Sequence, residues 1–471
     1  MDIRYTQAPP RSVETRAFIP LIAAAVWLTG PETWRWWLFA LLPMAWLTTA
    51  GIALLAKIHD GRVHQIHAAG GLLGFLVAVP ALLMGGGIHA LIAGTLSLWS
   101  FVVAGRIALS YQPLYEGAEP PEVRAGVDAK AAVDEALMAY FVAVATIPSG
   151  ASAEALCRDA LRLEEVLDEQ GWIANPQSFH ATPTAPEAVI SDAARWRGLD
   201  FERVSYPSGF IARPELPLAA NYGSYAGNQR AHLKVFRHAG VERPWLMCIH
   251  GYRMGADFMD FGLFNPLWLH KKLGYNLILP LLPLHGPRRN GRLSGDGYFD
   301  GNVLELLHAQ TQALWDVRRA IAWLRDREPK ARVGVYGVSL GGFNAALLAS
   351  YEADLDFVIA GIPLADAASA LWRNMPEVHE RFYRQWGMSQ ARYARILAPV
   401  SPLALKPLPA PEKLHIFAGA ADRVVTPDHP LKLAAHWQVP VRWYQGSHLS
   451  IRRELVTREC IGKALRDAGW K

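Results

Sequence analysis

The stretch A-R-V-G-V-Y-G-V-S-L-G-G-F-N-A-A, residues 331–346, decides how the second half of this chain folds. Its alternating valines predict a short strand that breaks at Gly337, and a helix is expected to start after Gly341. Ser339 lies at the corner between them. So sharp a turn leaves no room for a Cβ two residues before or after the serine, which is a physical reason for glycine at both places.

Ser339 would then stand clear of the backbone, beside the helix N-terminus and the amide of Leu340, where a negative charge is stabilised. Gly342 would keep the entering helix close to the sheet. The frame G-x-S-x-G also arises by chance in chains of this length, so its meaning depends on the sequence on both sides.

The composition of the 471-residue chain predicts two units, one of them strongly apolar. Hydrophobic residues make up 51% of the chain and are concentrated in the first 110 positions. The net charge of +5 is modest, and the basic residues are scattered among acidic ones. This pattern does not predict a nucleic-acid-binding surface. The three cysteines lack metal-ligand spacing, and Cys248 is expected to be a buried small residue in a reducing compartment.

Four apolar runs predict an all-α transmembrane region over residues 1–110. They cover about 17–29, 36–56, 68–88 and 90–105. The second and third reach the roughly twenty residues that a spanning helix needs, and the outer two are shorter. We expect four crossings, with Trp34, Trp36 and Trp37 as aromatic anchors at one interface. A soluble helical subdomain is the alternative, although these runs are apolar on all faces.

The flanking charges predict how this region is oriented as a multi-pass integral membrane protein. The basic residues that would share one side are Arg4, Arg11, Arg16, Lys57, Arg62 and Arg106. Because loops on the cytoplasmic side carry an excess of Lys and Arg, everything after residue 106 is expected in the cytoplasm.

Residues 111–199 are expected to bridge this region and a catalytic domain. A linker rich in Pro, Gly and Glu is followed by helices at about 127–145 and 152–169, the second with Ser152 as a candidate cap. Residues 172–199 are polar and rich in proline, and we expect an irregular arm there.

From residue 200 to 471, strand-like runs alternate with helical patterns, which predicts a mostly parallel sheet covered on both faces. The expected strands are 201–206, 232–236, 244–249, 275–282, the run before Ser339, 357–362, 414–418 and 439–444.

The order of motifs along these strands resembles the alpha/beta hydrolase family. His250-Gly251 follows one strand, the Ser339 frame a later one, Asp422 a still later one, and His448 lies near the C-terminus. The resemblance covers residues 200–471 and implies a doubly wound α/β fold with a helical cap. It also implies that Ser339 is the nucleophile, Asp422 the acid and His448 the base.

The same resemblance implies an oxyanion hole formed by the amides of Tyr252 and Leu340. His250 is expected to shape the loop rather than to transfer protons. Two alternatives stay open: Asp366 occupies the place where some hydrolases of this fold carry their acid, and His429 and His436 compete with His448. Only His448 follows the last strand.

An insertion at about 367–410 is expected to form the cap, and Trp372 and Trp386 would contact an apolar acyl chain unless they simply pack the cap. After the strand-like run 275–282, His285 and Arg288 are candidate substrate contacts. Arg288 and Arg289 form either a solvated loop pair, which is the favoured interpretation, or a receptor for an anionic headgroup.

Together these patterns predict a membrane-anchored serine hydrolase that cleaves carboxylic esters, lipid-like or otherwise amphiphilic, through an acyl-enzyme. Its partners would be a small-molecule ester and the bilayer, and no metal or organic cofactor is implied. The alternatives are a peptidase or thioesterase of the same fold, and a non-catalytic binding module. A transporter with an accessory hydrolase is disfavoured, because the apolar runs carry no acidic or basic residue.

Overall fold

The computed structural model describes residues 15–31, 33–58, 60–240 and 242–470. These residues form two compact units. The first takes the described residues up to Val144, with Gly419–Asp428 and Trp443–Leu455. The second takes Ala145–Ala418, His429–Arg442 and the described residues from Val456. The expected segment borders at 110 and 199 stay predictions, and Arg4 and Arg11 lie outside the described residues.

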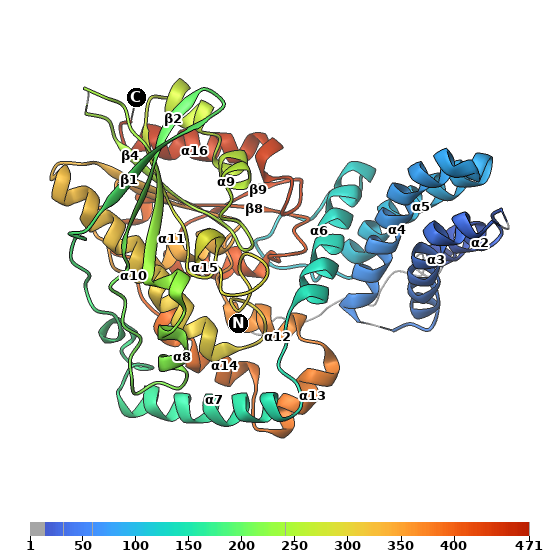
Figure 1. The fold of residues 1–471 in the computed structure, drawn as a ribbon, viewed down its shortest axis with the longest axis horizontal. Coiled ribbons are helices and arrows are strands. Elements are labelled where there is room, and N and C mark those ends of the chain that lie inside the picture. Colours follow the sequence, from blue (N-terminus) through green and yellow to red (C-terminus); the bar gives the residue numbers. More distant parts are fainter. Residues whose placement is uncertain (1–14, 32, 59, 241, 471) are drawn as a thin grey trace. The chain divides into compact units, whose positions relative to one another are not determined.

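The first unit is helical. Its helices are α2 (Phe18–Leu28), α3 (Trp34–Leu55), α4 (Gly61–Ala81), α5 (Gly87–Ser110) and α6 (Ala125–Val144), which pack against one another in the blue and cyan part of Figure 1. Among the described residues, Trp34–Leu55 and the 50-residue stretch Gly61–Ser110 are long and apolar enough to cross a membrane. Helix α2, with 11 residues, is too short by itself.

The 50-residue stretch folds back on itself and is not one straight rod. A π-helical segment, η1 (Leu82–Gly86), separates α4 from α5, and Gly85 and Gly87 take positive φ angles of 97° and 51°. Gly71 of α4 lies against Phe101 and Gly74 against Ser97, which is an antiparallel pairing. The third and fourth apolar runs therefore form a helical hairpin whose close approach depends on glycine.

One helix of this region is longer than the apolar run that predicts it, and one expectation is wrong. Helix α4 starts at Gly61, seven residues before the expected run, because the Asp60 carboxylate accepts the N–H of Arg62 at 2.9 Å and caps the helix. Trp36 is only 2% exposed and its indole N–H donates to the carbonyl of Trp27, so it is a core residue and not an interface anchor. Trp34, by contrast, is 70% exposed.

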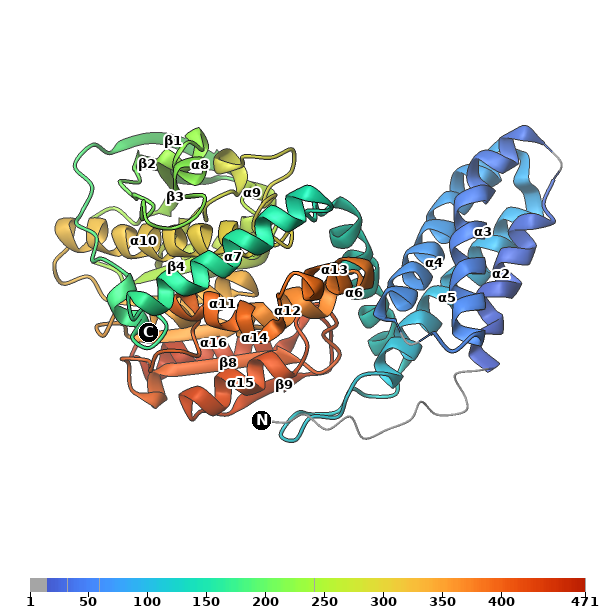
Figure 2. The ribbon, with the colours of Figure 1, turned by 90° about the horizontal axis from the view of Figure 1, so that it is seen from below.

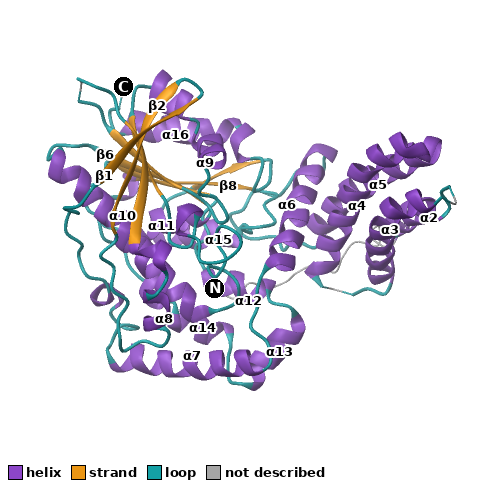
Figure 3. Ribbon diagram, in the orientation of Figure 1, coloured by secondary structure: helices purple, strands orange, loops and turns teal. Residues whose placement is uncertain are grey.

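The strands of the described residues form a nine-stranded sheet, drawn in orange in Figure 3. Its strands are β1 (Ile190–Trp196), β2 (Leu199–Pro207), β3 (Arg230–Phe236), β4 (Trp245–Ile249), β5 (Asn276–Pro280), β6 (Val333–Val338), β7 (Phe357–Gly361), β8 (Leu414–Gly419) and β9 (Val441–Tyr444). The order is β1-β2-β3-β5-β4-β6-β7-β8-β9, antiparallel from β1 to β5 and parallel from β5 to β8.

Helices cover both faces of this sheet, which explains why every residue of β4, β5, β6 and β7 is buried. Helices α9 (Asp257–Phe264) and α16 (Leu455–Asp467) lie on one face, and α10 (Val303–Arg327) and α11 (Leu340–Leu348) on the other (Figure 1). The ring of Tyr336 on β6 meets Phe264 edge-on, at 5.3 Å between centroids. The expected fold class is confirmed.

All eight expected strands are present, but β1 lies in the arm expected to be irregular. It pairs with β2 through the two-residue turn Arg197-Gly198, where both φ angles are positive, as a type I′ hairpin requires. Most of its residues are exposed, so it carries no apolar alternation that the sequence could show. Cys248 is buried, as expected.

The expected insertion forms three short helices, α12 (Ala367–Asn374), α13 (Glu377–Gln385) and α14 (Gln390–Ile396), with breaks at Pro376 and Gly387. Helix α7 (Ala151–Glu169) packs on α13 and α14 (Figure 2). Ser152 does not cap α7: Gly150 precedes the helix, and the Ser152 hydroxyl bonds Ser149 instead.

Candidate active site

Ser339 lies at the corner where β6 passes into α11. Its backbone has φ 60° and ψ −116°, a conformation that costs free energy for any residue with a Cβ and clusters at functional sites. Its N–H donates to the carbonyl of Gly361 in β7 at 2.9 Å, and its carbonyl accepts the N–H of Phe343 at 3.0 Å. The strained residue is therefore fixed by the strand beside it and by the helix after it.

The glycines around Ser339 are required by the backbone of their neighbours. A Cβ at Gly337 would lie 1.9 Å from the carbonyl oxygen of Gly341, and one at Gly341 would lie 1.8 Å from that of Ile249. Gly342 is less tight, with 2.9 Å to the carbonyl oxygen of Gly361. The steric reason expected for all three glycines is confirmed.

The loop after β4 lies beside the serine. A Cβ at Gly251 would be 3.6 Å from the Cβ of Ser339 and 3.4 Å from the carbonyl oxygen of Val338. Leu340 is the first residue of α11, and the first amides of a helix have no intrahelical acceptor. The backbone of Gly251 and the start of α11 thus lie beside the serine. The amides of Tyr252 and Leu340 as an oxyanion hole stay a prediction.

His250 shapes this loop, as expected. Its Nε2 accepts the N–H of Leu282 at 3.1 Å, and its Nδ1 lies 2.8 Å from the carbonyl oxygen of Gly251, to which it donates. Burial lowers the pKa of His250 to about 4, so the ring is neutral and both nitrogens are engaged.

Asp422 and His448 are brought together by the loops after β8 and β9. One carboxylate oxygen of Asp422 accepts the N–H groups of Val424 and Val425 at 2.9 and 2.8 Å, and the other lies 2.8 Å from His448 Nδ1. Both side chains are buried. Because the carboxylate accepts a hydrogen bond from Nδ1–H, Nε2 is the ring nitrogen that is free to accept a proton.

The pKa of His448 is raised. Burial by itself lowers this pKa, but the negative charge of Asp422, the hydrogen bond to it and the charge of Asp134 outweigh that effect. A base with a raised pKa binds a proton more readily, which suits a group that must take a proton from a hydroxyl.

The competing residues have other partners. Asp366 caps α12 and pairs with Lys432 at 2.7 Å, while its backbone N–H donates to His429 Nδ1 at 3.2 Å. His436 Nε2 lies 2.7 Å from the carbonyl oxygen of Leu405. None of these contacts resembles the Asp422–His448 pair.

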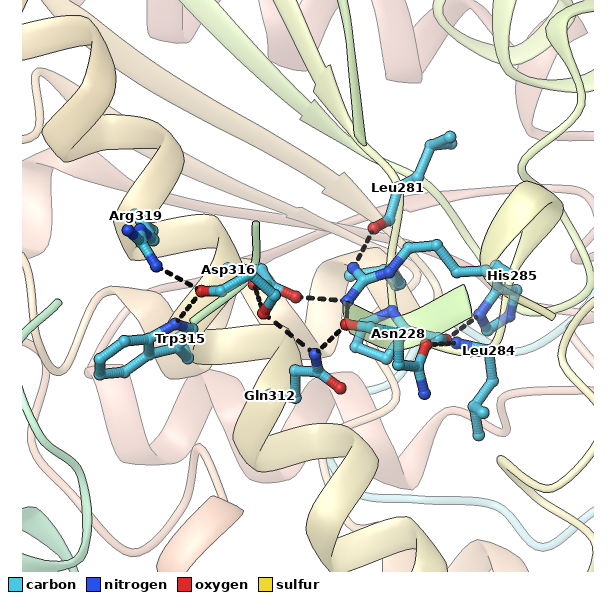
Figure 4. Close-up of polar contacts among 12 residues, drawn as sticks. Asn228, Leu281, Leu284, His285, Gln312, Trp315, Asp316 and Arg319 are labelled. Atoms are coloured by element: carbon cyan, nitrogen blue, oxygen red, sulfur yellow. Dashed lines mark hydrogen bonds and ion pairs between the residues drawn. The ribbon is translucent and has the colours of Figure 1, made fainter. Parts of the chain in front are cut away.

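Arg288 is fully buried and belongs to a polar network of the second unit. Figure 4 labels three of its partners, Leu281, Asn228 and Asp316. Its guanidinium pairs with Asp316 at 2.6 Å and donates to the carbonyl of Leu281 at 2.8 Å. Asp316 also accepts the hydroxyl of Ser208. Arg289 is exposed, as the solvated-pair interpretation expects, but that interpretation is wrong for Arg288, which is buried. Contact of Arg288 with an anionic headgroup stays a prediction.

His285 and Trp372 are buried and packed against other residues, and their contact with a substrate stays a prediction. His285 is fully buried, with Nδ1 2.8 Å from the carbonyl oxygen of Pro283. The indole N–H of Trp372 donates to Glu380 at 3.2 Å, and its ring meets Tyr393 edge-on. Trp386 is 40% exposed, and its contact with a substrate stays a prediction.

Sequence reasoning missed Asp134, a fully buried carboxylate on α6 that bonds the loop of His448. An acidic residue among alanines in the first half of a helix is a weak signal, because such a residue usually faces solvent. Its partners lie about 300 positions further along the chain, so no local pattern identifies them.

Nine strands in a mostly parallel sheet, helices on both faces and a serine on a strand-to-helix corner define an alpha/beta hydrolase-like fold. No family model matches the chain. Over 307 residues it is 34% identical to the uncharacterized protein MT2702 of Mycobacterium tuberculosis (strain CDC 1551 / Oshkosh), and the match covers 65% of this chain and 73% of that protein. The chain belongs to the same family as this mycobacterial protein.

Solved structures with some likeness to this one include two hydrolases. Acetyl xylan esterase 1 from Thermoanaerobacterium sp. JW/SL YS485 has a TM-score of 0.43 and 12% identity, covering 69% of this chain and 96% of that one. Oligopeptidase B from Leishmania major has a TM-score of 0.37 and 13% identity, covering 60% of this chain and 37% of that one.

Proposed function

We propose that this protein is a serine hydrolase that cleaves carboxylic esters through an acyl-enzyme on Ser339. The observation that carries the proposal is the strained corner at Ser339, with the backbone of Gly251 beside it. The hydrogen bond between Asp422 and His448 supports it, because a buried carboxylate on Nδ1 is what prepares an imidazole to act as a base at Nε2.

In this reaction Ser339 Oγ attacks the carbonyl carbon while His448 Nε2 takes the hydroxyl proton. The C=O bond becomes a C–O⁻ bond, and the amides of Tyr252 and Leu340 donate to that oxyanion. His448 then gives the proton to the leaving alcohol as the ester C–O bond breaks. Water repeats the sequence on the acyl-serine, and Asp422 stabilises the imidazolium in both halves.

The helical unit supports a proposal for the substrate class. Large apolar side chains are exposed on α3 to α5, among them Leu38, Leu41, Leu76, Leu83, Ile88 and Leu91. Exposed apolar surface of this extent marks contact with lipid or with another protein. We propose that these helices anchor the protein in a bilayer with the hydrolase on the cytoplasmic side, and that its substrate is a lipid or another amphiphilic ester.

Labelling of the detergent-solubilised protein with a fluorophosphonate, mapped by peptide mass spectrometry, tests the mechanism. We expect modification of Ser339 in the wild type and none in Ser339→Ala, with strong reduction in His448→Ala. A folded wild-type protein that is not labelled would overturn the proposal and favour a binding module. A panel of matched ester, thioester and amide substrates then separates esterase, thioesterase and peptidase activity.

Membrane anchoring is tested separately by extraction of cell membranes at alkaline pH. An integral protein stays in the membrane pellet and is released only by detergent. Release by alkaline buffer alone would contradict the anchoring, and equal activity on short soluble esters and on long-chain esters in micelles would contradict the lipid-like substrate.

A further inference from the structure

The buried carboxylate of Asp134, near the middle of α6, accepts four hydrogen bonds from two loops. One oxygen accepts the N–H groups of Arg423 and His448, at 3.0 and 2.8 Å. The other accepts the hydroxyl of Ser447 at 2.9 Å and the N–H of Leu449 at 3.3 Å. One side chain therefore fixes the backbone directly after Asp422 and the backbone of His448 itself.

Helix α6 contacts the same two loops at further points along its length. Glu135 pairs with Arg423 at 2.7 Å, and Lys130 pairs with Glu454 at 2.6 Å. Ala421 joins a small apolar cluster with Val127, Ala131 and Leu109. These contacts seat the helix against both loops and limit where Asp134 can lie.

The rest of α6 packs on α4 and α5. A Cβ at Gly105 of α5 would lie 1.9 Å from the carbonyl oxygen of Asp128, so these two helices touch at their backbones. Asp128 and Ala132 are one turn apart on the face toward α5, and Asp134, two positions later, is rotated by about 200°. The helix therefore has α4 and α5 on one face and the two loops on the other.

The surroundings of Asp134 act on its pKa in opposite directions. Burial and the charge of Asp422 raise the pKa of Asp134 to about 7, while His448 and the backbone donors lower it. Two ion pairs between α6 and these loops, Arg423–Glu135 and Lys130–Glu454, carry further charges, and each of these charges has a partner. A negative charge at Asp134 in turn raises the pKa of His448.

We propose that Asp134 is a positioning residue for the hydrolase reaction: from α6 its carboxylate holds the loops of Asp422 and His448 in the positions that the hydrogen bond between these two residues requires. The role rests on the proposed function. The helical unit then contributes to catalysis, because the carboxylate that orders both loops is carried on a helix packed against α4 and α5.

Asp134→Asn is the test, since it keeps the size of the side chain, removes its charge and replaces one acceptor oxygen by an NH₂ donor. Asp128→Asn is the matched control, because Asp128 lies on the same helix and pairs with Arg106, away from the loops. Both variants are made in the full-length chain in detergent, and circular dichroism checks that each is folded.

The readout is the pH profile of kcat/KM for p-nitrophenyl butyrate, together with the rate of fluorophosphonate labelling. The neutral form of His448 is active, so activity is lost as the pH falls through its raised pKa. Removing the charge at Asp134 lowers that pKa. We expect the acid limb of Asp134→Asn to move to lower pH and its plateau to fall at least tenfold, with Asp128→Asn unchanged.

A folded Asp134→Asn protein with the wild-type limb and plateau would overturn this role. If that variant does not fold, Ser447→Ala removes one of the four donors without touching the backbone. A plateau lowered more than twofold would then support the role, and an unchanged one would overturn it. If the wild-type protein is not labelled at Ser339, the proposed function and this role are overturned together. If the wild type is labelled but Asp134→Asn changes neither the labelling rate nor the pH profile, only the role is overturned.

Discussion

The corner that carries Ser339 and the loops that carry Asp422 and His448 are held in different ways. At the corner, backbone meets backbone, and Gly337 and Gly341 leave no space for any other side chain. The loops are instead held by hydrogen bonds to side-chain oxygens. Asp422 accepts hydrogen bonds from two backbone N–H groups of its own loop, and Asp134 accepts three from backbone N–H groups of both loops. A steric constraint of the first kind leaves a motif in the sequence, and hydrogen bonds of the second kind leave almost none.

The largest effect is expected where the corner itself is broken. Gly341→Ala would drive a methyl group into the carbonyl of Ile249, and neither backbone can move without displacing β4 or α11. We expect a loss of more than about 4 kcal/mol in the free energy of unfolding, or no folded protein. Chemical denaturation followed by tryptophan fluorescence measures it.

Gly223→Ala is the control for this change, because a Cβ there meets nothing within 4 Å at the end of the short helix α8 (Ala219–Gly223). It should leave the unfolding curve nearly unchanged. A Gly341→Ala protein as stable as Gly223→Ala would show that the corner is not sterically closed.

Asp422→Asn tests the loops without disturbing the corner. The amide can still accept from the backbone of its own loop, but it cannot hold His448 in the tautomer that leaves Nε2 free, so kcat should fall by about 10⁴-fold. Steady-state ester hydrolysis measures the loss, and far-ultraviolet circular dichroism should match the wild type. A tenfold loss or less would point to a different acid, with Asp366 next to be tested.

Variants of Arg288 distinguish a structural role for this residue from contact with the substrate. Arg288→Met leaves the carboxylate of Asp316 buried without its cation, which should cost about 3–5 kcal/mol of stability. The double variant Arg288→Met/Asp316→Leu should recover much of that loss. If instead stability is kept and only the KM for anionic esters rises, Arg288 would be a substrate contact after all.

The smallest effect is expected at the start of α6. A Cβ at Gly126 would meet nothing within 4 Å, and alanine restricts the unfolded chain, so Gly126→Ala should stabilise the protein by about 0.5–1 kcal/mol. A higher melting temperature with unchanged kcat would fit an exposed helix start. Destabilisation would mean that this end of α6 is packed more closely than the open space around Gly126 implies.

The sequence predicts much of the fold because buried parallel strands are continuous apolar runs, and all eight expected strands are found. It fails at β1, whose residues are mostly exposed, and at the start of α4, where a capping aspartate extends the helix through polar positions. In both places hydrogen bonding rather than hydrophobicity sets the structure.

At the candidate site the contrast is similar. The glycine frame identified the geometry of Ser339, and the order of motifs identified the paired Asp422 and His448. Arg288 was misassigned because a charged residue in a polar loop usually faces solvent, and its buried partner on α10 is not visible in the sequence. Asp134 was missed for the same reason.

The most direct test of the central claim is a rapid-mixing experiment with p-nitrophenyl butyrate, quenched in acid and analysed by peptide mass spectrometry. An acyl-enzyme mechanism predicts a burst of about one equivalent of p-nitrophenol and a butyryl group on the peptide containing Ser339. Ser339→Ala should give neither. Hydrolysis that continues in Ser339→Ala, or turnover by the wild type with no acyl group on Ser339, would contradict the account.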